Sequence, residues 1–246
     1  MNNSLKLALM PDGTPEIFKS IQGEGPKIGR ISTFVRTSEC NLTCTWCDTP
    51  YTWRWSEQLA HEEPEVYERS AWQRDISIDE IAETIRRLKC PHVIFTGGEP
   101  FLQQKRLVAL IDTLANFAQS IEFETNGTIA PTNEIVERAT LFVVSPKLAN
   151  SGVTRQKAIK KSIHAFVNSG KAVFKLVADK PEDLTEIQHF QKQFAISSED
   201  IWVMPCGRTP QQLHKTGALL ADHVIEAGFQ FTPRMHVDLF GDAQGT

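Results

Sequence analysis

The sequence predicts an α/β fold, a partial (β/α)6-type parallel barrel, in a single domain that spans residues 1–246. The first observation is that short apolar segments alternate with longer helical patterns along most of the chain. Such alternation builds βαβ units, whose right-handed crossovers form a parallel sheet that curls in one direction. The second is a composition of 41% apolar and 23% charged residues, which is typical of a globular domain. A chain of 246 residues is long enough for one sizeable domain and short for two.

The first barrel strand is predicted at 31–36, where Ile-Ser-Thr-Phe-Val-Arg alternates enough between apolar and polar residues. A polar insertion at about 53–75 comes later; it is rich in Trp and charge, and we expect a loop with a short helix there. Ser77-Ile78-Asp79-Glu80 is a capping-box pattern that begins a helix. This helix is predicted to end near Lys89, because Pro91 cannot continue it.

Beyond residue 91 the alternation becomes regular. Pro181 suits the first turn of a helix, which supports a helix start there. The carboxyl ends of parallel strands are where such folds bind ligands, so residues that follow strands are the candidate site. The predicted strands are 92–96, 121–124, 141–145, 172–177, 201–204 and 230–235, and the predicted helices are 104–118, 155–168, 182–194 and 211–227.

The charge and hydropathy patterns exclude several classes of partner. The net charge is −4 and Lys and Arg are not clustered, so we expect no nucleic-acid partner. No run of about 18 apolar residues is present, so we expect no membrane span. The first residues, Met-Asn-Asn-Ser-Leu-Lys, lack the apolar core of a signal peptide, and we expect a cytoplasmic protein.

Cys40, Cys44 and Cys47 form a C-x3-C-x2-C run within one predicted loop. Soft thiolates at this spacing select zinc or an iron–sulfur cluster. A structural zinc site would need a fourth ligand, for which His61 is the nearest downstream histidine. A thioredoxin-like pair of Cys44 and Cys47 would leave Cys40 unexplained. We therefore favour an oxygen-sensitive [4Fe–4S] cluster, in which three thiolates leave one iron open to a small molecule.

This cysteine run resembles the signature of the radical S-adenosyl-L-methionine (SAM) superfamily. The resemblance implies a barrel of the radical SAM kind. It also implies that SAM chelates the open iron through its amino and carboxylate groups. One electron then cleaves SAM, and the resulting 5′-deoxyadenosyl radical abstracts hydrogen from the substrate.

Polar motifs follow four of the predicted strands. Thr96-Gly97-Gly98-Glu99-Pro100 resembles the superfamily's GGE motif, and its two glycines let a ligand approach the backbone closely. Each motif also has a purely structural explanation, as a turn or, for Lys147, as a solvated surface lysine. Cys206 is expected to line the pocket, because a fourth thiolate would close the site, and Cys90 is expected in the core. The resemblance implies SAM contacts by Trp46, Asp48, Gly98, Glu99, Glu124, Asn126, Ser145, Pro146, Lys147, Met204, Pro205, Cys206 and Gly207.

Three further segments resemble the 7-carboxy-7-deazaguanine synthase family of the queuosine and other 7-deazapurine pathways. They are Phe18-Lys19-Ser20-Ile21-Gln22-Gly23-Glu24-Gly25, Phe34-Val35-Arg36 and Cys47-Asp48-Thr49. The resemblance implies a radical SAM lyase of the carbon–nitrogen type. Its reaction contracts the ring of 6-carboxy-5,6,7,8-tetrahydropterin to 7-carboxy-7-deazaguanine with loss of ammonia.

The residue chemistry of these segments suits a small anionic pterin. Arg36 can form a bidentate pair with its carboxylate. Gln22 and Glu24 can pair with the donor and acceptor edge of the ring, and Thr96 can bond it from the opposite side. The family also uses Mg²⁺ with a threonine that matches Thr49. The expected substrate contacts are Ile21, Gln22, Gly23, Glu24, Arg36, Thr96 and His236.

The resemblance also implies partner proteins, and several positions of this chain depart from the family's usual sequence. It implies a homodimer and a reductant protein such as flavodoxin. Met204 stands where a glutamine is common, and Arg234, Asp238 and Asp242 have no counterpart in the family's usual ending. The main alternative is an activating enzyme that generates a glycyl radical on a partner protein, which would not need Gln22 to Gly25. A zinc-stabilised binding module without catalysis is the second alternative.

Overall fold

The computed structural model describes residues 3–55, 66–153 and 159–246, which form one 10-stranded sheet. Its strand order is β10-β9-β8-β7-β6-β5-β3-β1-β4, with β2 paired to β3. The strands are β1 Ser4–Ala8, β2 Ile17–Ile21, β3 Ile31–Thr37, β4 Gln73–Ser77, β5 His92–Gly97, β6 Ser120–Thr125, β7 Leu141–Val144, β8 Ala172–Ala178, β9 Ile201–Pro205 and β10 Gln230–Phe231.

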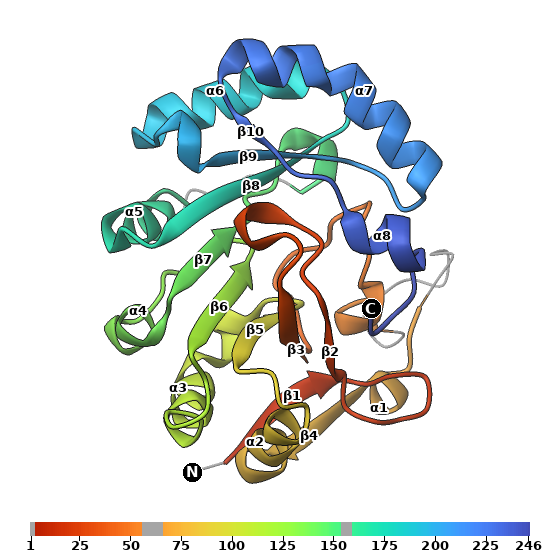
Figure 1. Ribbon diagram of the computed structural model, residues 1–246, viewed down its shortest axis with the longest axis vertical. Helices are drawn as coiled ribbons and strands as arrows, with labels where there is room; N and C mark the ends of the chain where they lie inside the picture. The colour runs from red at the N-terminus through yellow and green to blue at the C-terminus, as the bar shows by residue number, and fades with distance from the viewer. Residues whose placement is uncertain (1–2, 56–65, 154–158) are drawn as a thin grey trace.

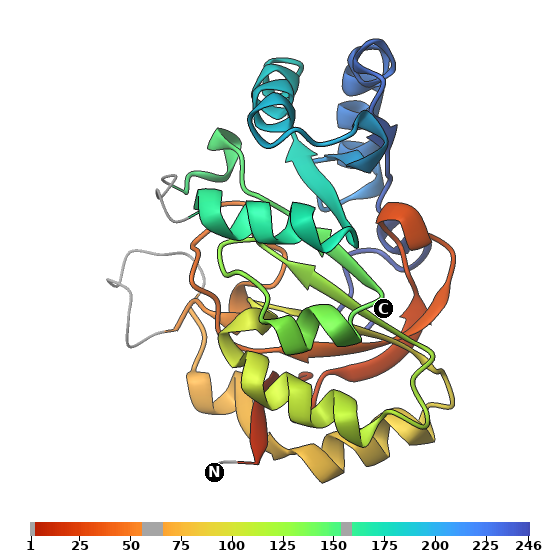
Figure 2. The ribbon, with the colours of Figure 1, turned by 90° about the vertical axis from the view of Figure 1, so that its left-hand side faces the viewer.

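Strand β3 and strands β5 through β10 pair in parallel and curl into an open barrel (Figure 1). Most of the helices cover its outer face, and a second view shows several of them stacked along one side (Figure 2). The predicted partial barrel is therefore confirmed. The helices are α1 Arg69–Trp72, α2 Ile78–Arg87, α3 Gln104–Thr113, α4 Asn133–Arg138, α5 Ile159–Ser169, α6 Glu182–Phe194, α7 Pro210–Ala227 and α8 Met235–Phe240.

Helix α2 illustrates how local sequence sets these elements. The Ser77 side chain accepts a hydrogen bond from the backbone N–H of Glu80, as the capping box predicts. Ile78, Ile81 and Ile85 fall at helical spacing and are all buried. Full burial of each such side chain contributes roughly 1.5–3 kcal/mol, so this face holds the helix against the sheet.

The outward faces of β5, β6 and β7 carry an aromatic core. Phe123 stacks between Phe95 and Phe142, with ring centroids 5.5 and 5.8 Å away. Phe101 and Phe166 pack onto the same cluster from the helix side. In β6 the alternate positions are Glu122 and Glu124, so the strand presents aromatics to the helices and carboxylates to the barrel interior. A polar interior is unusual for a parallel sheet and points to a ligand site.

The structure differs from the sequence prediction at the sheet edge. Strands β1, β2 and β4 were not predicted, and β4 begins within the last residues of the segment taken as the polar insertion at 53–75. It pairs antiparallel with β1 at the edge, where exposed polar residues such as Arg74 and Asp75 are tolerated. Residues 56–65 of that insertion, which include His61, lie outside the described residues.

Two boundaries at the carboxyl-terminal side also differ. The strand predicted at 230–235 shortens to β10, because Pro233 has no N–H for the ladder and α8 begins soon after it. The helix predicted at 155–168 is α5, and residues 154–158 lie outside the described residues.

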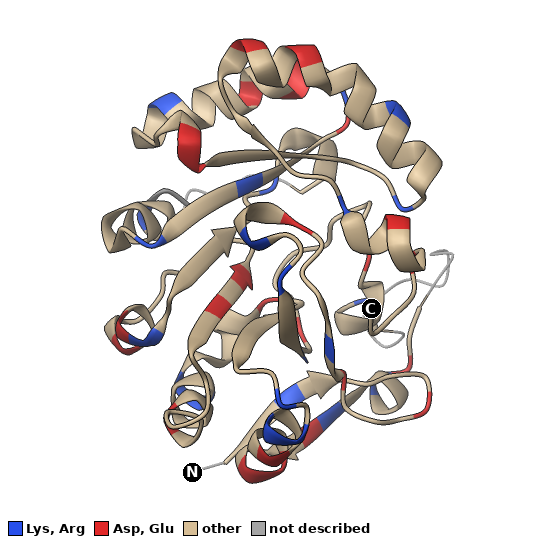
Figure 3. Cartoon of the chain, viewed as in Figure 1, with Lys and Arg blue, Asp and Glu red and all other residues tan. Residues whose placement is uncertain are grey.

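Charged residues of both signs occur on the outer helices, without one dominant basic face in this view (Figure 3). Within the described residues, none of the helices combines the length and the apolar character that a membrane crossing requires.

Candidate active site

A cavity of about 210 Å³ opens at the carboxyl ends of the parallel strands. Each strand from β3 to β9 in the parallel series contributes a residue at or just beyond its end. The contributing residues are Arg36, Thr96, Glu124, Ser145, Val177 and Met204. The position is the one expected for a ligand site in a parallel α/β fold.

The three predicted cluster cysteines line this cavity together, on the loop that follows β3. Cys44 is buried, and Cys40 and Cys47 are half-buried. Two N–H donors approach the sulfurs: Trp53 Nε1 lies 3.3 Å from Cys47 Sγ, and Asn126 Nδ2 lies 3.9 Å from Cys40 Sγ. Donors to ligand sulfurs are one way in which a protein tunes a cluster's reduction potential.

The backbone at Glu39 turns the chain from β3 into the cysteine loop. Its φ is +75°, a left-handed conformation that costs a non-glycine residue about 1–3 kcal/mol. Its carboxylate lies 2.6 Å from Lys6 Nζ and 3.6 Å from Arg69, and its carbonyl accepts the Glu99 N–H at 2.8 Å. A Cβ on Gly98 would lie 2.2 Å from the Glu39 carbonyl oxygen. The motif after β5 is therefore glycine-rich because it packs on the cysteine loop.

The donor set of this loop fits a cluster with one open position. All three thiols are free of disulfides and line the same cavity. Burial raises the pKa of Cys40 to about 12, so metal binding is what would convert this thiol to a thiolate. Cys206 lines a neighbouring cavity instead, as expected for pocket lining rather than for a fourth ligand.

Neither of the remaining two cysteines lies at the cysteine loop as a fourth thiolate for zinc. Cys206 lines the neighbouring cavity. Cys90 lies apart in the core, where its Sγ is 3.3 Å from the Ile31 carbonyl oxygen. Thr49 lines the main cavity.

Lys147 and Trp46 form one wall of the main cavity. Lys147 Nζ lies 5.3 Å from the Trp46 ring centroid, a cation–π contact, and 3.0 Å from Ser145 Oγ. Trp46 Nε1 donates to the Asn150 carbonyl at 3.1 Å, which fixes the ring. This wall separates the main cavity from a second one of about 540 Å³. The two cavities share Trp46, Asp48, Val177, Met204 and Arg234.

Five of the expected SAM residues lie away from the main cavity. Pro205, Cys206 and Gly207 line the second cavity, which adjoins it. Glu99 is fully buried behind the wall: its carboxylate accepts N–H bonds from Phe101 and Asn126 at 3.0 and 2.8 Å. Glu99 thus holds the turn after β6 in place. Pro146 contributes to neither cavity.

The loop after β2 faces the strand ends across the main cavity. Gln22 Nε2 donates to Glu124 at 3.0 Å, and the other oxygen of Glu124 accepts the Thr96 hydroxyl at 2.8 Å. This chain of hydrogen bonds connects the loop to β6 and β5. Burial, and then the charge of Glu124, raise the pKa of the neighbouring Glu122 to about 7.

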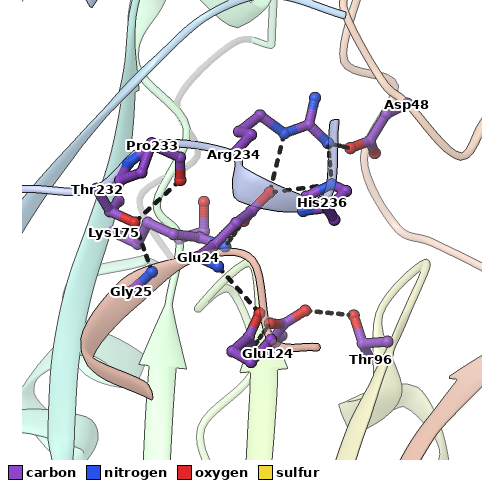
Figure 4. A network of polar contacts seen from close by, with 12 residues as sticks. Glu24, Gly25, Asp48, Thr96, Glu124, Lys175, Thr232, Pro233, Arg234 and His236 are labelled. Carbon is purple, nitrogen blue, oxygen red and sulfur yellow. Dashed lines mark hydrogen bonds and ion pairs between the residues drawn. The ribbon is translucent and has the colours of Figure 1, made fainter. Parts of the chain in front are cut away.

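Glu24 is the centre of a buried ionic network (Figure 4). Its two oxygens pair with Lys175 and with Arg234 Nε, the latter at 2.9 Å, and His236 lies 3.8 Å away. Arg234 also pairs with Asp48, next to Cys47. Burial would raise the pKa of Glu24, but Lys175 and Arg234 outweigh it and hold the pKa well below its usual range. The network therefore joins the Gln-Gly-Glu loop to the cysteine loop.

Arg36 is held from behind by a second buried carboxylate. Its Nε lies 2.5 Å from Glu16, which is fully buried and also accepts bonds from Tyr51 at 3.0 Å and Gln244 at 2.7 Å. No described residue hydrogen-bonds to the two terminal nitrogens of Arg36, which lines the cavity. The side chain is thus fixed through Nε, and its terminal nitrogens are available to an anion.

Comparison with known proteins agrees with this site. Residues 34–142 match the family model of the radical SAM superfamily. The 7-carboxy-7-deazaguanine synthase of Pyrobaculum aerophilum is 32% identical over 231 residues, which cover 94% of this chain and 95% of that protein. This chain belongs to the 7-carboxy-7-deazaguanine synthase family.

A second member of the family, from Halobacterium salinarum, is 33% identical over 94% of this chain and 91% of that protein. The crystal structure of QueE from Escherichia coli shares the fold, with a TM-score of 0.64 at 22% identity. The match covers 94% of this chain and 95% of that one.

Three residues that shape this synthase-family site were not predicted from the sequence. Lys175, Glu16 and Arg234 all have buried charged groups. Lys175 had a readable signal, because it is a lone charge inside the apolar strand Ala-Val-Phe-Lys-Leu-Val-Ala. Arg234 lies 210 positions from Glu24, and no local pattern joins them. The cavity does bring together Ile21, Gln22, Gly23, Glu24, Arg36, Thr96 and His236, the residues expected to bind substrate.

Proposed function

We propose that this chain converts 6-carboxy-5,6,7,8-tetrahydropterin to 7-carboxy-7-deazaguanine with loss of ammonia, as a radical SAM lyase. The observation that supports this most strongly is a shared cavity. The three-cysteine loop, the Gln-Gly-Glu loop and Arg36 all line it. A glycyl-radical activating enzyme would need neither of the latter two, so the geometry favours the small-molecule reaction.

The cysteine side of the cavity would hold the cofactors. When bound, a [4Fe–4S] cluster on Cys40, Cys44 and Cys47 together with SAM supplies the radical that abstracts hydrogen. Lys147 and Ser145 offer a cation and a hydroxyl for an anionic group of SAM. Asn126 offers its amide next to the sulfurs, and the second cavity provides space for the nucleoside portion.

The opposite side would hold the pterin. Arg36, fixed at Nε by Glu16, would direct its remaining donors at the substrate carboxylate. Glu24 stays ionised and would accept N–H donors from the ring edge, while Gln22 and Thr96 are positioned by Glu124. These contacts would hold the reacting carbon near the radical source, and such positioning supplies much of the rate enhancement in reactions of this kind.

Further features of the proposal extend beyond the site. We propose that Mg²⁺ binds at the Thr49 hydroxyl together with the substrate carboxylate. We also propose a homodimer that works in the cytoplasm and receives electrons from a reductant protein such as flavodoxin. The Mg²⁺ ion, the homodimer and the reductant protein are supported by the resemblance of the sequence motifs to the family.

The experiment is an anaerobic assay of reconstituted protein with SAM, a chemical reductant, Mg²⁺ and carboxytetrahydropterin, read by mass spectrometry. We expect 7-carboxy-7-deazaguanine in the wild type. Cys44→Ala should form none, whereas Cys90→Ala, which alters a core cysteine outside the cavity, should retain turnover. SAM cleavage without any deazaguanine product from the wild type would refute the assignment.

A further inference from the structure

Lys175 is a buried ammonium group on the wall of the substrate cavity. It sits on β8 between Phe174 and Leu176, which are core residues, and is itself only 6% exposed. Lysine is almost never buried to this degree without partners, because transfer of an unpaired ammonium from water is very costly. Figure 3 shows basic residues in blue on β8 and acidic residues in red on β6, two strands of the barrel. The surroundings of Lys175 must therefore account for its charge.

The protein satisfies Lys175 only in part. An ammonium carries three N–H donors, and the one hydrogen bond that Lys175 makes within the described residues goes to Glu24. Burial lowers the pKa of Lys175, but Glu24 and Glu124 outweigh it and raise the pKa, so the group stays charged. Two donors thus have no described protein acceptor, in a residue that lines the cavity.

Arg234, the other cation on Glu24, differs in this respect. Its Nε donates to Glu24 at 2.9 Å, one terminal nitrogen donates to the Gly207 carbonyl at 3.0 Å, and the other pairs with Asp48. All three of its nitrogens therefore have protein partners. Of the two cations that hold Glu24, Lys175 is the one whose single nitrogen bonds only Glu24 among the described residues and keeps two of its three donors for a ligand, whereas each nitrogen of Arg234 already bonds a protein partner.

The edge of the proposed substrate complements this arrangement, and the argument here rests on the proposed function. The pyrimidinone edge of carboxytetrahydropterin presents a ring N–H and an amino group as donors, with a carbonyl acceptor beside the N–H. A carboxylate that accepts both donors keeps lone pairs for its own cations. A cation bonded to the carboxylate oxygen that accepts the ring N–H then lies beside the ring carbonyl, because the carbonyl is next to that N–H.

We propose that Lys175 is a specificity-determining residue that donates a hydrogen bond to the ring carbonyl of the pterin, next to Glu24. Together the two side chains read an acceptor–donor–donor edge. A ring with an amino group in place of the carbonyl would set donors against the ammonium, and its neighbouring ring nitrogen, which then carries no hydrogen, would set a lone pair against Glu24. Sites built this way reject the wrong partner far more strongly than an apolar pocket does.

The experiment compares two stable ligands in anaerobically reconstituted protein, by isothermal titration calorimetry. They are 6-carboxypterin, which has the carbonyl, and 2,4-diamino-6-carboxypteridine, which has an amino group there. We expect the wild type to prefer the pterin by at least about 30-fold. Lys175→Met should lose about 10-fold to 100-fold of pterin affinity and narrow the preference at least tenfold, since a hydrogen bond from a charged group is lost.

Two controls keep this test sharp. Lys19→Met removes an exposed lysine on β2 and should leave both affinities unchanged. The iron content and SAM affinity of Lys175→Met should equal those of the wild type; if that variant does not fold, Lys175→Gln carries the same comparison. An equal loss for both ligands, with the preference intact, would mean a purely structural role and would overturn the inference. A wild type that turns over no carboxytetrahydropterin would instead overturn the proposed function.

Discussion

Replacing Arg234 with Met removes a buried charge that joins three parts of the chain. The side chain is 8% exposed and pairs with Glu24, which is 12% exposed, with the Gly207 carbonyl and with Asp48. Breaking a buried pair from one side costs about 3–5 kcal/mol of folding free energy. Glu24 keeps Lys175, and the half-exposed Asp48 can be hydrated, so we expect the lower end, about 3 kcal/mol.

Thermal unfolding of the reconstituted protein under anaerobic conditions measures this cost. For a chain of this size, about 3 kcal/mol corresponds to a fall in Tm of roughly 6–12 °C. Arg234→Lys keeps the charge but cannot make all three contacts, so its Tm should lie between those of the wild type and Arg234→Met. Arg87→Met removes a cation that is 67% exposed and should shift Tm by less than about 2 °C. If the Tm of Arg234→Met also falls by less than about 2 °C, the ionic network does not stabilise the fold.

Three further expectations follow from the site. Glu16→Gln removes the charge that fixes Arg36, so KM for carboxytetrahydropterin should rise about tenfold; steady-state kinetics that show only a fall in kcat would contradict this. Gly23→Ala places a Cβ 2.1 Å from His236 Nδ1 and should cost about 1–3 kcal/mol in urea unfolding; unchanged stability would contradict the close packing. Glu122 has a pKa of about 7 when folded and 4.5 as its ordinary value, so the folded state binds more protons between these values. Stability should fall there as pH rises, by up to about 3 kcal/mol, and Glu122→Gln should flatten the profile.

Much of the barrel was predictable because its signals are local. Strands β5 to β9 are short apolar runs between amphipathic helices, and the cysteine spacing lies within eight residues. The edge strands were missed for the opposite reason. β4 is polar on its exposed side and lies next to a Trp-rich segment, so its sequence has the character of a loop. Its pairing with β1, some 70 positions away, is what makes it a strand.

The site was predictable as a set of residues but not as a set of contacts. Arg36 and Glu24 were identified by their motifs, yet neither motif indicates that Glu16 holds the first or that Arg234 holds the second. The Arg234 contact arises where the carboxyl-terminal segment folds back over the Gln-Gly-Glu loop, as Figure 4 shows, and the Glu16 contact arises where β2 pairs antiparallel with β3. Long-range convergence of this kind depends on the topology and is not encoded in any one segment.

The cluster is best tested by electron paramagnetic resonance of the reduced, anaerobically reconstituted protein, recorded with and without SAM. We expect a cluster signal that changes when SAM binds the open iron. Chemical analysis of the same sample should give about four iron atoms and four sulfides per chain. A chain that carries a single four-coordinate zinc, or a cluster whose signal SAM leaves unchanged, would contradict the cluster assignment.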